Sequence, residues 1–148
     1  MHILLAEDNP GDRLLVEEAL RHHGLDFTLG IVDDIDTASS YLNRIGKFPD
    51  ALCPDVMLVD LNLPKASGFE LVQMFRSHPD CSLVPLIIMT SSDAPSDRQM
   101  AAALGAAYYF RKPSDLDDFM DLGRIVREVV EKNEPGAWER PERNQSKR

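Results

Sequence analysis

Short apolar runs alternate along the chain with longer segments in which apolar residues recur three or four positions apart. Two of the runs, 56–59 and 86–89, are apolar at every position, as expected of strands buried on both faces of a parallel sheet. The longer segments have the spacing of amphipathic helices. The pattern predicts an α/β fold with a doubly wound, five-stranded parallel sheet flanked by helices on both faces. The predicted strands are residues 3–6, 27–32, 56–59, 84–89 and 106–110.

Capping residues indicate where two of the predicted helices begin. Asn9 offers an N-cap, and Pro10 suits the first position of a helix that follows it. Ser114, with Asp117 three residues later, has the pattern of a capping box. We therefore expect the first helix to start at Pro10 and the last helix to span residues 115–132.

The remaining helices and connections follow from the same spacing. Helices are predicted at residues 35–45, 68–77 and 96–104, and a long surface loop at 46–54. Residues 133 onward contain Pro and Gly and lack a helical pattern. The chain should consist of one domain over residues 1–132 and a C-terminal tail over 133–148.

The last predicted helix has a broad apolar face. At 100° per residue its apolar side chains span an arc of about 220°, wider than the roughly 100° that one core contact needs. Part of this arc is expected to need a second cover. That cover could be a second copy of the chain, giving a homodimer, or the tail with Trp138 folded back.

Composition narrows the classes of partner. Sixteen Lys and Arg against 25 Asp and Glu give a formal net charge of −9, which disfavours binding to nucleic acid or to an anionic membrane surface. The N-terminus lacks the pattern of a signal peptide, and no apolar run is long enough to span a membrane. We expect a soluble, cytoplasmic protein. Cys53 and Cys81 lack metal-site spacing, so we expect two reduced thiols rather than a zinc site or a disulfide.

Polar residues that could bind a ligand or take part in catalysis follow four of the predicted strands. Glu7 and Asp8 follow the first strand, Asp60 the third, Thr90 the fourth, and Lys112 comes soon after the fifth. Ligands of open parallel sheets bind beyond the carboxyl ends of the strands, so these side chains should meet there. Clustered carboxylates either take up protons or share a divalent cation, and Mg²⁺ suits such a site.

The same residues suggest phosphoryl chemistry. Asp60 is the carboxylate that stands alone at a strand end, which makes it the candidate nucleophile. Thr90 and Lys112 would supply a hydrogen bond and a positive charge to a transferred phosphoryl group.

Five motifs, in their order along the chain, resemble those of the receiver domains of two-component response regulators, a family with a CheY-like (βα)5 fold. The spacings from Asp60 to Thr90, 30 residues, and from Thr90 to Lys112, 22 residues, also match the family. The local sequences of residues 7–12 and 60–65 and the length of the loop at 46–54 are similar to those of single-domain regulators that accompany bacterial phytochrome kinases. The motifs are Glu7-Asp8-Asn9, Asp60-Leu61-Asn62-Leu63-Pro64, Gly68, Met89-Thr90-Ser91 and Arg111-Lys112-Pro113.

The resemblance implies a role for each acidic residue at the strand ends. Asp60 would accept a phosphoryl group from a sensor histidine kinase, such as a phytochrome kinase, or from a phosphotransfer protein. Glu7, Asp8, Asp60 and the backbone carbonyl of Asn62 would hold Mg²⁺, Asp8 directly and Glu7 through water.

The resemblance also implies a conformational switch. Thr90 would move to the phosphoryl oxygen and Tyr109 would follow it inward, while Lys112 would pair with the phosphoryl charge. A cis peptide bond before Pro113 would help to aim Lys112. Output would come from contact with a downstream protein, or a second copy, through the face formed by the fourth helix, fifth strand and fifth helix.

Some alternatives stay open on the sequence alone. Asp12 is interpreted as a helix-capping acid in preference to a residue at the mouth of the site, and Tyr109 could be a packed aromatic of the fifth strand. An enzyme that hydrolyses phosphate esters through an aspartyl phosphate is disfavoured, because Asn62 replaces the acid that would protonate the leaving group. The third alternative is an interaction scaffold that works without phosphorylation.

Overall fold

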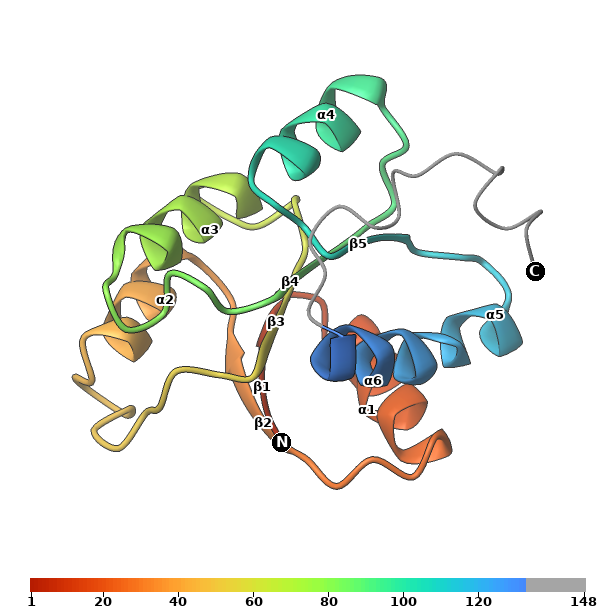
Figure 1. The fold of residues 1–148 in the computed structure, drawn as a ribbon, viewed down its shortest axis with the longest axis horizontal. Helices are drawn as coiled ribbons and strands as arrows, with labels where there is room; N and C mark the ends of the chain where they lie inside the picture. The colour runs from red at the N-terminus through yellow and green to blue at the C-terminus, as the bar shows by residue number, and fades with distance from the viewer. Residues whose placement is uncertain (133–148) are drawn as a thin grey trace.

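The computed structural model describes residues 1–132, and strands alternate with helices along that part of the chain (Figure 1). All strand pairs are parallel, and the sheet order is β2-β1-β3-β4-β5. The strands are β1 (His2–Ala6), β2 (Thr28–Val32), β3 (Val56–Val59), β4 (Leu86–Thr90) and β5 (Tyr108–Arg111). The helices are α1 (Pro10–His22), α2 (Ile35–Leu42), α3 (Gly68–Ser77), α4 (Pro95–Ala103), α5 (Leu116–Met120) and α6 (Leu122–Lys132). The predicted doubly wound fold is confirmed.

Helices cover both faces of the sheet. Figure 1 shows α1, α5 and α6 on one side and α2, α3 and α4 on the other. Each side has its own apolar core, because alternate residues of β1, β3 and β4 point to opposite faces. All four residues of β3 are buried, which explains its continuous hydrophobicity. No helix among residues 1–132 has the length and apolar character to cross a membrane.

The first helix begins as the capping residues predict. The Asn9 side chain accepts hydrogen bonds from the backbone N–H groups of Gly11 and Asp12, and Pro10 is the first helical residue. The cap satisfies two of the N–H groups that lack a partner within the helix. This end of α1 lies beside the carboxyl ends of the strands.

The last helix differs from the prediction in its cap and its continuity. Asp115, not Ser114, is the N-cap, and its carboxylate accepts from the backbone N–H groups of Asp117 and Asp118. An ionised carboxylate is also favoured over a hydroxyl by the helix dipole. The single predicted helix is two helices, α5 and α6, which are interrupted at Asp121.

The broad apolar face of this region is largely covered within the chain itself. Leu122, Ile125, Val126 and Val129 of α6 are buried against α1 and the sheet. The approach to α1 is close, because a Cβ built on Gly123 would lie 2.3 Å from the Ala19 carbonyl oxygen. These residues need no second cover, whereas Leu116 is exposed and Met120 and Val130 are only partly buried, so a second cover stays a prediction for that part of the arc. Trp138 lies outside the described residues.

The prediction of two reduced thiols is also contradicted. Cys53 and Cys81 form a disulfide, although 28 residues separate them in sequence. Cys53 belongs to the segment 43–55 between α2 and β3, and Cys81 to the turn between α3 and β4. Both segments lie at the start of neighbouring strands, which brings the two Cα atoms to 5.5 Å. The spacing of the two cysteines in the sequence does not indicate that they lie close together in the fold.

Candidate functional site

Backbone hydrogen bonds that continue the sheet hold the key side chains at its carboxyl edge. The Glu7 N–H donates to the Val32 carbonyl, and the Asp60 N–H donates to the Ala6 carbonyl, each at 3.0 Å. The Lys112 N–H donates to the Thr90 carbonyl at 2.8 Å. The strand ends thus fix where each functional side chain starts. Glu7, Asp60 and Thr90 are the buried polar residues among those described.

Lys112 lies at the centre of a cluster of three carboxylates. Its Nζ donates at 2.7 Å to Glu7 Oε1, Asp12 Oδ2 and Asp60 Oδ2. One carboxylate oxygen from each acid lies within 4.8 Å of the others, a spacing that suits a metal ion. Three acids around one ammonium leave an excess of negative charge when all are ionised. The donor set, all oxygen and largely buried, fits a hard divalent cation such as Mg²⁺.

Burial changes the acid–base behaviour of this cluster. Removal from water raises the pKa of Glu7 from 4.5 to about 7, and the negative charge of Asp60 adds to the rise, while hydrogen bonds from Lys112 and the Asn9 N–H oppose it. Burial alone would lower the pKa of Lys112, but hydrogen bonds to Asp12, Asp60 and Glu7 outweigh it and hold that pKa above its usual range. Lys112 therefore remains a cation, and Glu7 titrates near neutral pH.

The structure brings together most, but not all, of the residues expected at the site. Glu7, Asp60 and Lys112 meet directly, and the Asn62 N–H donates to Asp60 Oδ1 at 3.0 Å. Asp8 is exposed and lies outside the described carboxylate cluster. Successive residues of an extended chain point to opposite sides, so Asp8 faces away when Glu7 faces inward.

Asp12 corrects the preferred interpretation of that residue. It lies in the first turn of α1, but Asn9 provides the cap, and the Asp12 carboxylate reaches Lys112 instead. The signal in the sequence is its distance from the cap, which places it one turn into a helix whose start faces the strand ends.

Arg13 was not predicted at the site, because no motif or spacing distinguishes it. Its Nε donates to the Glu7 carbonyl at 2.7 Å, and its guanidinium lies 3.9 Å from an Asp33 carboxylate oxygen. The side chain therefore ties the turn between β1 and α1 to the end of β2.

Thr90 and Tyr109 lie on neighbouring strands at the same edge. Thr90 is fully buried, and its Oγ1 accepts from the Ser92 N–H. Tyr109 is 4% exposed, and its hydroxyl donates to the Ser92 carbonyl at 2.9 Å. Burial raises the pKa of Tyr109. The Arg98 guanidinium carbon lies 4.4 Å from the centre of the Tyr109 ring. Tyr109 is thus turned inward, against the loop that follows Thr90.

The peptide bond before Pro113 does not have the expected geometry. Every peptide bond among residues 1–132 is trans, including the one between Lys112 and Pro113. Lys112 is aimed by its backbone bond to Thr90 and by its three carboxylate partners.

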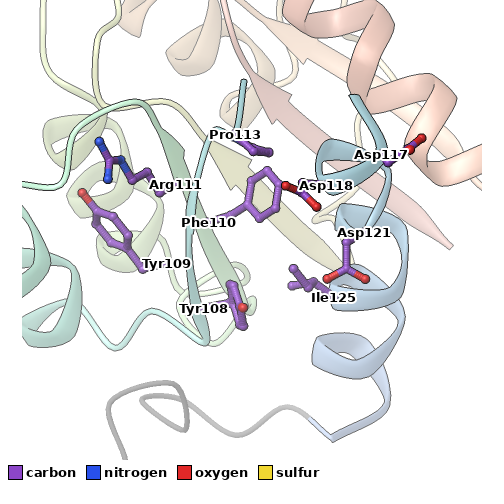
Figure 2. A pocket seen from close by; sticks show the side chains of 9 residues that line it. All are labelled: Tyr108, Tyr109, Phe110, Arg111, Pro113, Asp117, Asp118, Asp121 and Ile125. Atoms are coloured by element: carbon purple, nitrogen blue, oxygen red, sulfur yellow. The ribbon is translucent and has the colours of Figure 1, made fainter. Parts of the chain in front are cut away.

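A groove of about 470 Å³ lies between β5 and the helices α5 and α6. Figure 2 shows Tyr108 and Phe110 on the side of β5 that faces these helices, with Tyr109 and Arg111 on its other side. The helix side carries the carboxylates of Asp117, Asp118 and Asp121. The groove is therefore aromatic on one wall and acidic on the other.

Comparison with known protein families identifies the family of this chain. The family model of the response regulator receiver domain matches residues 3–123. The chain belongs to the receiver-domain family of response regulators. The receiver is 32% identical over 120 residues to the response regulator Rcp1 of Synechocystis sp. strain PCC 6803, covering 81% of this chain and 82% of that protein.

Solved structures of phytochrome response regulators are similar to this receiver. The phosphorylated cyanobacterial phytochrome response regulator RcpA matches with a TM-score of 0.79 and 29% identity, over 89% of this chain and 94% of that one. The Mn²⁺-bound form of Rcp1 also gives a TM-score of 0.79, with 30% identity, over 92% and 99% of the two chains. Receivers similar to this one thus take up a phosphoryl group and bind a divalent cation.

Proposed function

We propose that Asp60 is the phosphoacceptor of this receiver and that a histidine kinase or phosphotransfer protein is the donor. The observation that supports this best is the placement of Asp60 Oδ2, 2.7 Å from Lys112 Nζ, in a cluster with Glu7 and Asp12. The carboxylate would attack the phosphorus of a phosphohistidine, and the imidazole would leave. The Lys112 ammonium and the Thr90 hydroxyl would then stabilise the charge of the phosphoryl oxygens.

The proposed metal is Mg²⁺, held by Glu7, Asp60 and the Asn62 carbonyl, with Asp8 turned inward from its exposed position. When bound, Mg²⁺ neutralises charge on the transferring group. The residues of the chain orient the acceptor: the Asn62 N–H holds Asp60 Oδ1, which leaves Oδ2 on the side of Lys112.

Asp8 and Asp12 can be distinguished as metal ligands by substitution. We expect Asp8→Asn to weaken Mg²⁺ binding by at least about tenfold, as loss of a charged ligand does, and Asp12→Asn to weaken it less. Calorimetric titration with Mg²⁺ measures both. If Asp12→Asn abolished binding and Asp8→Asn left it intact, Asp12 would be the ligand.

The proposed output is a change of contact at the surface of α4, β5 and α5. Tyr109 and the loop after Thr90 lie next to this surface, so a movement at Thr90 would be transmitted to it. The partner would be a downstream protein or a second copy of the chain, with the aromatic and acidic groove of Figure 2 at its edge. We further propose a cytoplasmic protein whose only chemistry is its own phosphorylation and dephosphorylation.

A phosphorylation assay tests the acceptor. The full chain is incubated with Mg²⁺ and a small acyl phosphate, and the intact mass is measured. We expect one phosphoryl adduct, none in Asp60→Asn, and an unchanged adduct in Asp26→Asn, an exposed acid far from the cluster. Absence of an adduct in the unmodified chain, together with absence of Mg²⁺ binding, would favour an interaction scaffold. Rapid turnover of ordinary phosphate esters would favour a phosphohydrolase.

A further inference from the structure

The two cysteines lie in segments that other contacts already bring together. Asp55 N–H donates to the His2 carbonyl at 2.7 Å, and the Tyr41 hydroxyl donates to the Leu52 carbonyl at 2.8 Å, which hold the segment 43–55 on both sides of Cys53. The Cys81 N–H donates to the His78 carbonyl at 3.1 Å. These single hydrogen bonds bring the two sulfurs back within reach of each other after the bond opens, but unlike a covalent link each of them breaks and re-forms, so the segment opens more often in the reduced chain.

We propose that Cys53 and Cys81 are a reversible redox modification site, at which thiol–disulfide exchange opens and closes a covalent link between segment 43–55 and the turn after α3. Proteins that work among reduced thiols rarely carry permanent disulfides, and those that form there are commonly redox-responsive. This step rests on the proposed function, which places the chain in the cytoplasm among reduced thiols.

The surroundings of the pair favour exchange at Cys53. Cys81 is 2% exposed, whereas Cys53 is only half-buried and can be reached by a small disulfide. Arg44 and His78 line the same small cavity as the two cysteines, a space of about 10 Å³. The Arg44 Nε donates to the Ala51 carbonyl at 2.9 Å, which holds a positive charge beside the segment that carries Cys53. The cavity is too small to admit a larger reagent, so the reaction takes place at the outer side of Cys53.

The exchange balances with a small disulfide such as glutathione disulfide as oxidant. The Cys53 thiolate attacks one sulfur of the small disulfide, whose S–S bond breaks, and one glutathione thiolate leaves. The Cys81 thiolate then attacks the Cys53 sulfur, the protein disulfide forms, and the second glutathione thiolate leaves. Two electrons pass from the cysteines to the oxidant, and the two protons released by the cysteines end on glutathione. Excess glutathione drives the same steps in reverse.

The link has a mechanical consequence for one end of the domain. It closes a loop over 28 residues of sequence separation that includes β3 and α3 entirely. Closing such a loop restricts the unfolded chain, and we expect the oxidised protein to melt roughly 10 °C higher than the reduced one. Opening the link also releases segment 43–55, where trypsin can cleave after Arg44 and Lys47. Asp60 lies at the opposite end of β3.

The experiment equilibrates the full-length native chain in glutathione buffers from fully reduced to fully oxidised. The samples are quenched in acid and alkylated with N-ethylmaleimide, and the intact mass is measured. We expect two adducts in the reduced buffer, and in the oxidised buffer no adduct and a mass lower by two hydrogens. Tryptic cleavage of segment 43–55 should be at least about tenfold faster in the reduced chain, since cleavage tracks local opening.

Matched variants separate the disulfide from other effects of the buffer. Cys53→Ser and Cys81→Ser should each show the fast cleavage at every buffer ratio. Ser82→Ala, beside Cys81, keeps the backbone carbonyl that binds Arg76 and should titrate like the unmodified chain. The proposal is overturned if both cysteines are alkylated in every buffer, if the pair stays oxidised in the most reducing buffer, or if cleavage does not depend on the redox state.

Discussion

Lys112 neutralises part of the acidic cluster at the carboxyl edge of the sheet. Its side chain is 12% exposed, and its three partners are a buried glutamate, a buried aspartate and a partly buried aspartate. The ammonium and a bound metal compete for the same carboxylate oxygens. Lys112 therefore has two opposing effects: it stabilises the chain without metal, and it weakens metal binding.

Replacing Lys112 by Met should separate these two effects. Without metal, three crowded carboxylates lose their counter-charge, and we expect the free energy of unfolding to fall by roughly 2–4 kcal/mol. Mg²⁺ affinity should rise by about tenfold because the competing cation is gone. Urea unfolding with and without Mg²⁺, and calorimetric titration, measure both quantities. Lys132→Met, at the exposed end of α6, is the control. Weaker Mg²⁺ binding in Lys112→Met would contradict the competition.

Glu7 should make magnesium binding depend on pH. Its pKa of about 7 lies above the ordinary 4.5, so between these values the folded chain holds a proton that the unfolded chain has released. The contribution of Glu7 to stability is therefore largest below about pH 4.5 and is lost as the pH rises to about 7. Mg²⁺ must displace this proton, so its affinity should rise about tenfold per pH unit up to about pH 7 and then level off.

Calorimetric titrations at about pH 6, 7 and 8 measure this dependence. Glu7→Gln cannot hold the proton, and although it should bind Mg²⁺ more weakly, its affinity should be flat over the same range. An unchanged slope in Glu7→Gln would assign the titration to another group.

Glycines decide how closely some elements can pack. A Cβ on Gly123 would meet the Ala19 carbonyl at 2.3 Å, and one on Gly68 would meet the Asp60 carbonyl at 2.2 Å. The first contact sets the distance between α1 and α6. The second places the start of α3 directly under the residue proposed as phosphoacceptor.

We expect Gly123→Ala to destabilise the fold by roughly 2–4 kcal/mol, because backbone on both sides must move apart. Gly46→Ala is the control. It has open space around the new Cβ but a φ of +65°, so it should cost only about 1 kcal/mol. Urea unfolding followed by circular dichroism gives both values. Equal losses in the two variants would show that α1 and α6 yield without cost.

Local sequence patterns predict helices and strands well, but they predict contacts between segments that are distant in the sequence poorly. The start of α1 at Pro10 and the limits of β3 and α3 agree with the prediction, because caps and apolar spacing are local. The break at Asp121 was missed, since the apolar spacing of residues 115–132 runs through it. The sequence did not predict the disulfide, and it favoured the capping interpretation of Asp12 over the position at the site, because both features depend on how separate segments pack. Glu7, Asp60, Thr90 and Lys112 were predictable, since parallel strands must end at a common edge.

At the scale of the whole molecule, most of the apolar side chains of α6 are buried within the chain, whereas Leu116 of α5 is exposed. The apolar face of α6 is covered by α1 and the sheet, and the net charge of −9 opposes close approach of two copies. The sequence-based reason for a dimer is thereby reduced to Leu116 and the partly buried Met120 and Val130. We expect phosphorylation-dependent association to come from a change at the surface of α4, β5 and α5.

We expect the full chain to be a monomer in Mg²⁺ alone and to form a dimer when beryllium fluoride, a phosphoryl mimic, is added. Sedimentation at several protein concentrations measures the mass in both conditions. Asp60→Asn should stay monomeric throughout and is the control. A monomer in both conditions would contradict the dimer and would leave a different downstream protein as the partner.

The length of β3 has a consequence for signalling. Its four residues extend over about 13 Å, farther than the distance at which changes at two sites in a protein usually influence each other. Cys53 precedes the strand and Asp60 follows it. Oxidation of Cys53 before the strand and phosphorylation of Asp60 after it would therefore have little effect on each other. One small domain could then respond to two signals independently, its disulfide to the redox conditions and its aspartate to the kinase.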